Sequence, residues 1–92
     1  MKLTHLSHNH FRVSDADAAK LARASGHSLP RIGYEAEVPL PNGKKGWLKR
    51  DYASTPSPNK RGWVWAISSN ARIVSDDERV KPYVRWGQVY EV

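Results

Sequence analysis

The fold is decided by residues 32–44, which read IGYEAEVPLPNGK. In the first nine of these residues, apolar side chains alternate with glycine, glutamate or proline, which is the period of a strand with one buried face. The Asn-Gly pair that follows is typical of a tight hairpin turn. We therefore expect a strand over 32–40, with Tyr34, Ala36 and Val38 facing inward, and a returning strand over 46–52. The prolines of this stretch suggest that the hairpin lies at a sheet edge.

Two helices are predicted from capping signals. Ser14 can cap a helix over 15–25, whose first turn carries two aspartates, and Gly26 can end it. Small and apolar residues form a narrow stripe along this helix. Residues 75–78, SDDE, form a capping box for a short second helix, which Pro82 ends or kinks.

The remaining pattern predicts more strands. A Pro/Ser-rich loop over 54–60 precedes a strand over 62–67, and β-favouring residues over 84–92 indicate a strand that pairs into the sheet. We expect a single α+β domain over residues 1–92, in which an antiparallel β-sheet packs against one main helix, with a short second helix. The length of 92 residues suits one domain with a small core and a shallow surface site.

Composition excludes several classes of protein. With no cysteine, the chain has no disulfide framework, thiolate metal site or cysteine nucleophile. It also has no leader-like apolar segment and no apolar run long enough to cross a membrane, so we expect a cytoplasmic protein with no membrane partner.

The net charge of +6 is concentrated in the middle of the chain. Residues 38–72 hold seven Lys and Arg against Asp51 alone, interleaved with three tryptophans and Tyr52. Cations neutralise phosphates and flat rings stack on unpaired bases, so this mixture suits a nucleic acid. The alternative is a solvated basic hairpin over an aromatic core. The residues expected to bind a nucleic acid or partner are Lys44, Lys45, Trp47, Lys49, Arg50, Lys60 and Arg61.

No pattern indicates catalysis, and we expect no enzyme activity, no cofactor and no small-molecule substrate. The sequence lacks a nucleophile elbow, a phosphate-binding loop and a zinc-protease motif. The cluster of His5, His8 and His10 matches no established metal site, so no metal is expected. Glu35 and Glu37 share one face of their strand, and a solvated face that pairs with lysines across the hairpin explains them better than acid/base chemistry.

Residues 60–67, KRGWVWAI, resemble the RNP1 pattern of RNA-recognition motifs. The resemblance implies that Trp63 and Trp65 stack on bases in a stand-alone module that binds single-stranded RNA or DNA. Val64 departs from the Gly or Ala usual at its position. The competing interpretation, which we prefer, places both rings in the hydrophobic core.

In size, single-domain make-up and absence of cysteine, the chain resembles small phage-encoded inhibitors such as the anti-CRISPR proteins. This resemblance covers general make-up and assigns no residue a role. It implies a protein that disables a CRISPR effector in the cytoplasm of the host cell by contacting protein subunits and guide RNA. The expected partner is therefore a nucleoprotein complex, or single-stranded nucleic acid in the stand-alone alternative. A third class, an assembly protein that oligomerises through its tryptophan surface, also stays open.

Overall fold

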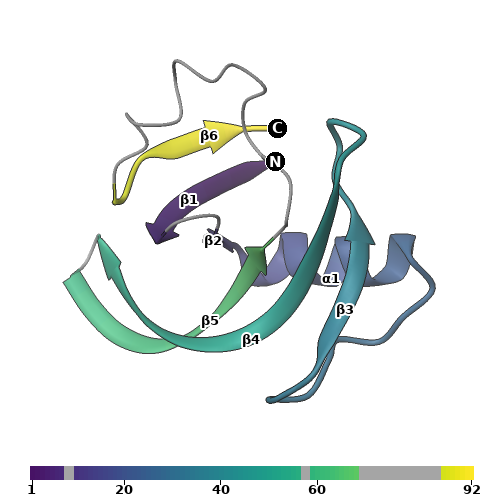
Figure 1. Cartoon of the computed structure of the whole chain (residues 1–92), viewed down its shortest axis with the longest axis horizontal. Helices are drawn as coiled ribbons and strands as arrows, with labels where there is room; N and C mark the ends of the chain where they lie inside the picture. The colour runs from purple at the N-terminus through teal and green to yellow at the C-terminus, as the bar shows by residue number, and fades with distance from the viewer. Residues whose placement is uncertain (8–9, 57–58, 69–85) are drawn as a thin grey trace.

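The described residues form one antiparallel sheet with a helix on one face (Figure 1). The computed structural model describes residues 1–7, 10–56, 59–68 and 86–92. The elements in this part of the chain are β1 (Lys2–Ser7), β2 (His10–Val13), α1 (Asp15–Ala24), β3 (Glu35–Pro39), β4 (Lys45–Pro56), β5 (Asn59–Ser68) and β6 (Val89–Glu91). The α+β prediction is confirmed at this level, while the second helix expected after Ser75 lies outside the described residues.

The strands lie in the order β3-β4-β5-β2-β1-β6, and each pair of neighbours is antiparallel. The chain starts with the β1–β2 hairpin, passes through α1 to the far edge of the sheet, and returns through β3, β4 and β5 to pair with β2. Strand β6 then pairs with β1, which brings the two ends of the chain side by side (Figure 1). The expected strand in the tail is thus confirmed over Val89–Glu91.

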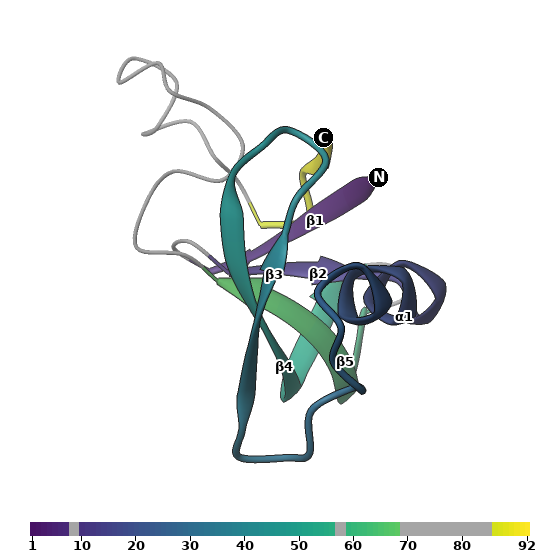
Figure 2. The ribbon, with the colours of Figure 1, turned by 90° about the vertical axis from the view of Figure 1, so that its right-hand side faces the viewer.

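Helix α1 has the predicted ends. The Ser14 hydroxyl accepts a hydrogen bond from the Asp17 amide at 3.1 Å, and Gly26 follows the last turn with φ +75°. The helix packs against β3 and β5 on one side of the sheet, which we call the inner face (Figure 2). Its buried side chains are Ala18, Leu21 and Ala22, which join a core that also contains Leu3, Phe11, Val13, Val38, Leu40, Leu48, Trp65 and Ile67.

The β3–β4 hairpin confirms the predicted turn and corrects the start of the first strand. Val38 is buried and lies opposite Gly46, as the alternation predicts. However, β3 begins only at Glu35, and Ile32 and Tyr34 are 61% and 69% exposed, so the inward placement of Tyr34 is wrong. The reason is a turn in which the Tyr34 amide donates to the Arg31 carbonyl and Gly33 adopts φ +92°.

The β4–β5 ribbon is longer than predicted. The segment 54–60 was expected to be a loop, but β4 continues to Pro56 and β5 starts at Asn59, with Ser54 opposite Arg61 and Thr55 opposite Lys60. The Thr55 hydroxyl also donates to the Lys60 carbonyl at 3.1 Å. The loop prediction is therefore wrong for residues 54–56 and 59–60, while residues 57 and 58 lie outside the described part of the chain. Pro56 lies at the end of the ribbon, where its missing N–H interrupts little of the ladder. The paired ends of the ribbon lie on the left of Figure 1, away from α1.

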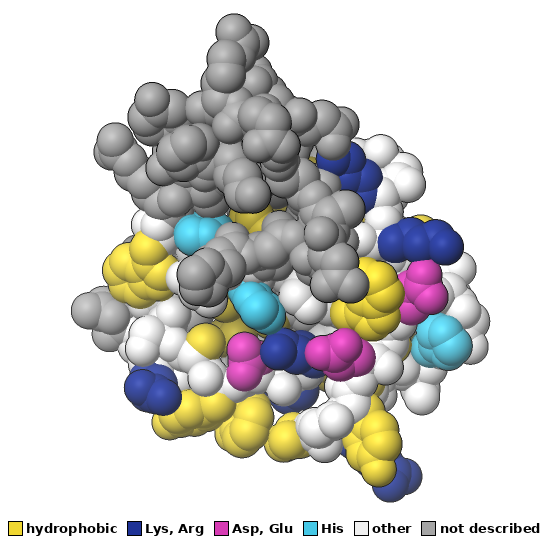
Figure 3. Space-filling model, in the orientation of Figure 1, with side chains coloured by type: hydrophobic (Ala, Val, Ile, Leu, Met, Phe, Trp, Pro, Cys, Tyr) yellow, Lys and Arg dark blue, Asp and Glu magenta, His cyan; other side chains and the backbone are white. Residues whose placement is uncertain are grey.

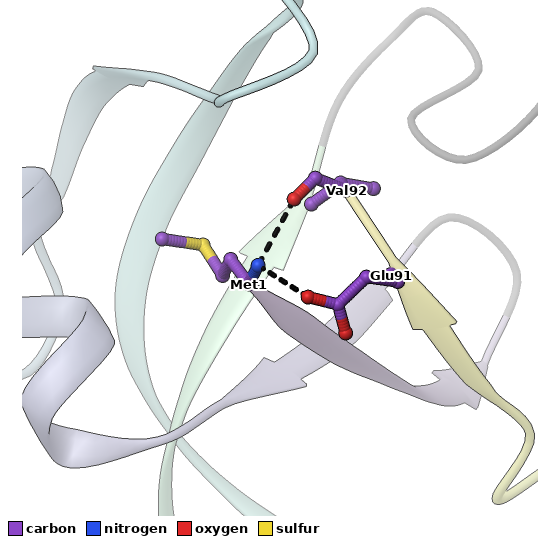
Figure 4. Close-up of polar contacts among 3 residues, drawn as sticks. All are labelled: Met1, Glu91 and Val92. Atoms are coloured by element: carbon purple, nitrogen blue, oxygen red, sulfur yellow. Dashed lines mark hydrogen bonds and ion pairs between the residues drawn. The ribbon is translucent and has the colours of Figure 1, made fainter.

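An ammonium–carboxylate contact joins the two ends of the chain at the β1–β6 edge of the sheet. The Met1 ammonium donates to Glu91 Oε1 at 2.8 Å and to the Val92 carbonyl at 3.0 Å (Figure 4). The hydrogen bond from this ammonium, followed by the positive charges of the ammonium and Lys2, holds the pKa of Glu91 below its ordinary value.

The pKa of the Glu91 carboxyl is therefore expected to lie below 4.5 in a side-chain carbon NMR titration of the folded protein. Because the folded-state pKa is lowered, the contact stabilises the fold above the unfolded-state pKa, and this contribution is lost as the pH falls through the folded-state value. Acetylating the Met1 amine should move the pKa of Glu91 back up. An unchanged pKa after acetylation would contradict this assignment.

Candidate nucleic-acid interface

The residues predicted to bind a partner lie on both faces of the sheet. Side chains alternate along a strand, and residues directly opposite each other on neighbouring strands share a face. Arg50 lies opposite Trp65, and Arg61 shares the side of Trp65, so both arginines belong to the inner face. The opposite parity places Lys45, Trp47, Lys49 and Lys60 on the other side, the outer face, while Lys44 precedes β4 in the turn.

Two lysines of the outer face, Lys45 and Lys49, lie beside carboxylates. Lys45 Nζ lies 3.3 Å from Glu37 Oε1, and Lys49 lies directly opposite Glu35. Asp51 follows Lys49 on the same face. Figure 3 shows this face, where acidic side chains (magenta) lie beside Lys and Arg (dark blue) over β3 and β4. The mixture of signs weakens the attraction for a phosphate backbone, and the expected cross-hairpin pairing is confirmed for Glu37 and Lys45.

The inner face instead combines arginines with aromatic rings along the β4–β5 ribbon. The Arg50 guanidinium lies 4.9 Å from the centroid of the Trp65 ring, and that of Arg61 lies 5.4 Å from the Tyr52 ring. The rings of Tyr52 and Trp63 meet in a T-shaped contact, with centroids 5.2 Å apart and planes inclined by 68°. We call Arg50, Tyr52, Arg61 and Trp63 the aromatic–arginine surface.

Exposure separates the two tryptophans of β5. Trp65 is 9% exposed and belongs to the core, as preferred from the sequence, whereas Trp63 is 49% exposed, so the core interpretation of Trp63 is wrong. The difference follows from position, because Trp65 lies opposite both Val13 and Arg50, while Trp63 lies nearer the end of the ribbon, beyond the register of β2. Tyr52, the neighbour of Trp63, is 48% exposed. Two large rings are therefore available at the surface.

Tyr52 and Trp63 are the residues that the predicted site lacked. A signal for them exists in the sequence, since Arg50 and Tyr52 are two residues apart, as are Arg61 and Trp63, and each pair must share a face of its strand. The sequence does not give the register that places Tyr52 directly opposite Trp63. The alternation of a strand also puts Lys49 and Arg50 on opposite faces, but without the register it does not show which residues lie beside each of them.

Of the residues considered for metal binding or catalysis, His5, His10, Glu35 and Glu37 lie in different parts of the sheet, and His8 lies outside the described residues. His5 is buried, with its ring 5.4 Å from that of Phe11, and His10 begins β2 opposite Ser68. Across residues 1–7, 10–56, 59–68 and 86–92, no three His, Asp or Glu side chains gather into a group that could hold a metal ion. Glu35 and Glu37 lie on the outer face beside the lysines.

The arginine Arg50 also has an anionic neighbour. Its guanidinium lies 3.9 Å from Asp15 Oδ1, in the first turn of α1, and its side chain is 28% exposed. Arg61, in contrast, is exposed and lies farther along the ribbon. The end of the surface near α1 is therefore partly neutralised, and the end near Arg61 is the cationic one.

Comparisons with models of protein families, with curated proteins and with solved structures find no significant match. Within the described part of the chain, no helix has the length and apolar character needed to span a membrane. The aromatic–arginine surface is consequently identified from its geometry.

Proposed function

We propose that this protein is a non-enzymatic binding protein whose aromatic–arginine surface docks on a nucleic-acid-containing complex through an unpaired segment of the nucleic acid. The observation that carries the proposal is the pair of half-exposed rings, Tyr52 and Trp63, directly opposite each other with the Arg61 guanidinium beside them. Exposed aromatic rings stack on unpaired bases whatever the nucleotide sequence, and a neighbouring arginine can donate hydrogen bonds to a phosphate.

Unpaired nucleic acid fits this surface better than duplex does. Stacking requires a base face that is free of its neighbours, and each stacked base contributes about 1–3 kcal/mol. A duplex would offer mainly its phosphates. On the outer face, Lys45 and Lys49 lie beside Glu37 and Glu35, and these carboxylates weaken the attraction of the two lysines for phosphates. The general resemblance to small phage-encoded inhibitors makes a CRISPR effector with its guide RNA the specific target that we propose.

A charge reversal on each face tests this function with matched variants. We expect Arg61→Glu to weaken binding of a fluorescein-labelled 15-nucleotide single-stranded RNA at least 10-fold in an anisotropy titration, because it replaces the exposed cation beside the rings. The same substitution at Lys45, which already contacts Glu37, should change the affinity less than about 3-fold. Arg61→Glu should also make the slope of log affinity against log salt shallower by about 0.7.

The outcomes distinguish recognition of unpaired nucleic acid by the aromatic–arginine surface from general charge attraction. Binding of the naked RNA, with the expected difference between the two variants, supports direct recognition of unpaired nucleic acid. If Lys45→Glu is as harmful as Arg61→Glu, general charge attraction replaces the aromatic–arginine surface as the explanation. If the parent protein does not bind the RNA at all, recognition through unpaired nucleic acid is wrong.

A further inference from the structure

We infer that the aromatic–arginine surface holds a single unpaired nucleotide, with its base on Trp63 and a neighbouring phosphate at Arg61. This inference rests on the proposed function and narrows its ligand from an unpaired segment to one nucleotide. It differs from the sequence resemblance, which implies one base on each of Trp63 and Trp65.

The rings of the ribbon do not offer a continuous platform. Trp65 is 9% exposed and the Arg50 guanidinium lies over it, while that of Arg61 lies over Tyr52. The planes of Tyr52 and Trp63 are inclined by 68°, so two consecutive stacked bases cannot lie flat on both. Among the described residues, Trp63 is the ring of this ribbon that is half exposed and has no guanidinium over it.

The charges around Trp63 give the nucleotide a direction. Toward α1, Arg50 is matched by Asp15, whose side chain is 87% exposed. A second phosphate at this end would meet the Asp15 carboxylate. Toward the end of the ribbon, Arg61 is exposed and lies beside Tyr52. One base on Trp63 and one phosphate at Arg61 therefore use the favourable contacts of this surface. A second nucleotide adds little binding free energy.

A set of RNA hairpins tests this inference. The probes are a blunt hairpin and the same hairpin with one, two or four unpaired adenosines, prepared separately at the 3′ end and at the 5′ end. We expect the first adenosine on at least one end to tighten binding about 5-fold or more in an anisotropy titration, and each further adenosine less than about 2-fold. Replacing the first adenosine with an abasic residue, which keeps the phosphate, should abolish most of the gain.

Trp86 supplies the matched control, since it is 49% exposed like Trp63 but lies outside the ribbon. Trp63→Ala should remove the gain from the first adenosine, whereas Trp86→Ala should retain it. Trp63→Phe, which restores a smaller ring, should recover part of the gain. Thermal unfolding of each variant establishes that it is folded at the temperature of the titration.

Each result has a distinct meaning. An even gain for every added adenosine leaves the proposed function standing and overturns the single-nucleotide site. Equal losses in the Trp63 and Trp86 variants, or a full gain from the abasic probe, also overturn it. If neither these hairpins nor the 15-nucleotide single strand binds, the proposed function fails, and the single-nucleotide site fails with it.

Discussion

Replacing Trp65 with alanine is expected to destabilise the fold by about 3–5 kcal/mol, whereas the same change at Trp63 should cost about 1 kcal/mol or less. Trp65 is 9% exposed and packs in the core, so its loss leaves a cavity. Trp63 is 49% exposed and loses mainly its contact with Tyr52. The free energies of unfolding of both variants can be compared by urea denaturation followed by far-UV circular dichroism.

The same two variants separate stability from binding. Trp63→Ala should remain folded and lose affinity for unpaired RNA. The loss of affinity in Trp65→Ala should follow the fraction of unfolded protein, since the ring has no exposed face to offer a base. Equal losses of stability in the two variants would contradict the division of the tryptophans between core and surface.

A second large effect is expected at Gly46, where alanine should destabilise the fold by about 1–3 kcal/mol. A Cβ at this position would lie 2.5 Å from Ile67 Cγ2, and Ile67 is fully buried. Its γ-methyl group is on a β-branched side chain that has few rotamers, so the clash must be relieved by a shift within the core. The urea midpoint should fall without a change in the slope of the transition.

Gly62 provides the control for this prediction, because it lies in the adjacent strand β5 and a Cβ there would meet no atom within 4 Å. Gly62→Ala should leave the stability unchanged or raise it by up to about 1 kcal/mol, since alanine loses less backbone entropy than glycine on folding. If the two alanine variants are equally stable, close packing of Gly46 against Ile67 does not limit the stability of the sheet.

Local chemistry made much of the fold predictable. The cap at Ser14, the break at Gly26 and the alternation that buries Val38 act within a few residues, and the structure confirms all three. The errors arose where the same local residues are compatible with two backbone structures, a strand or a turn. Gly33 adopts a turn conformation, so the strand starts after Tyr34. The prolines after Thr55 are typical of a loop, but cross-strand pairing extends the β4–β5 ribbon to Pro56.

The candidate site was only partly predictable, because its members come from two strands. The basic and aromatic composition identified Arg50 and Arg61, and the parity of each strand separates them from Lys49 and Lys60. Which ring lies beside which arginine depends on the register between β4 and β5 and on how far α1 covers the inner face. Both are properties of the whole fold, and no short motif encodes them.

The pairing of β1 with β6 has a consequence for the order in which the molecule folds. The Met1–Glu91 contact joins residues 90 positions apart, whereas the β3–β4 hairpin closes over the short Leu40–Lys44 turn. Closing a long loop costs more chain entropy than closing a short one, and folding is slower where contacts join residues distant in sequence. The meander of β3, β4 and β5 is therefore expected to form early and the β1–β6 pair late, so the β4–β5 ribbon forms before the chain ends meet.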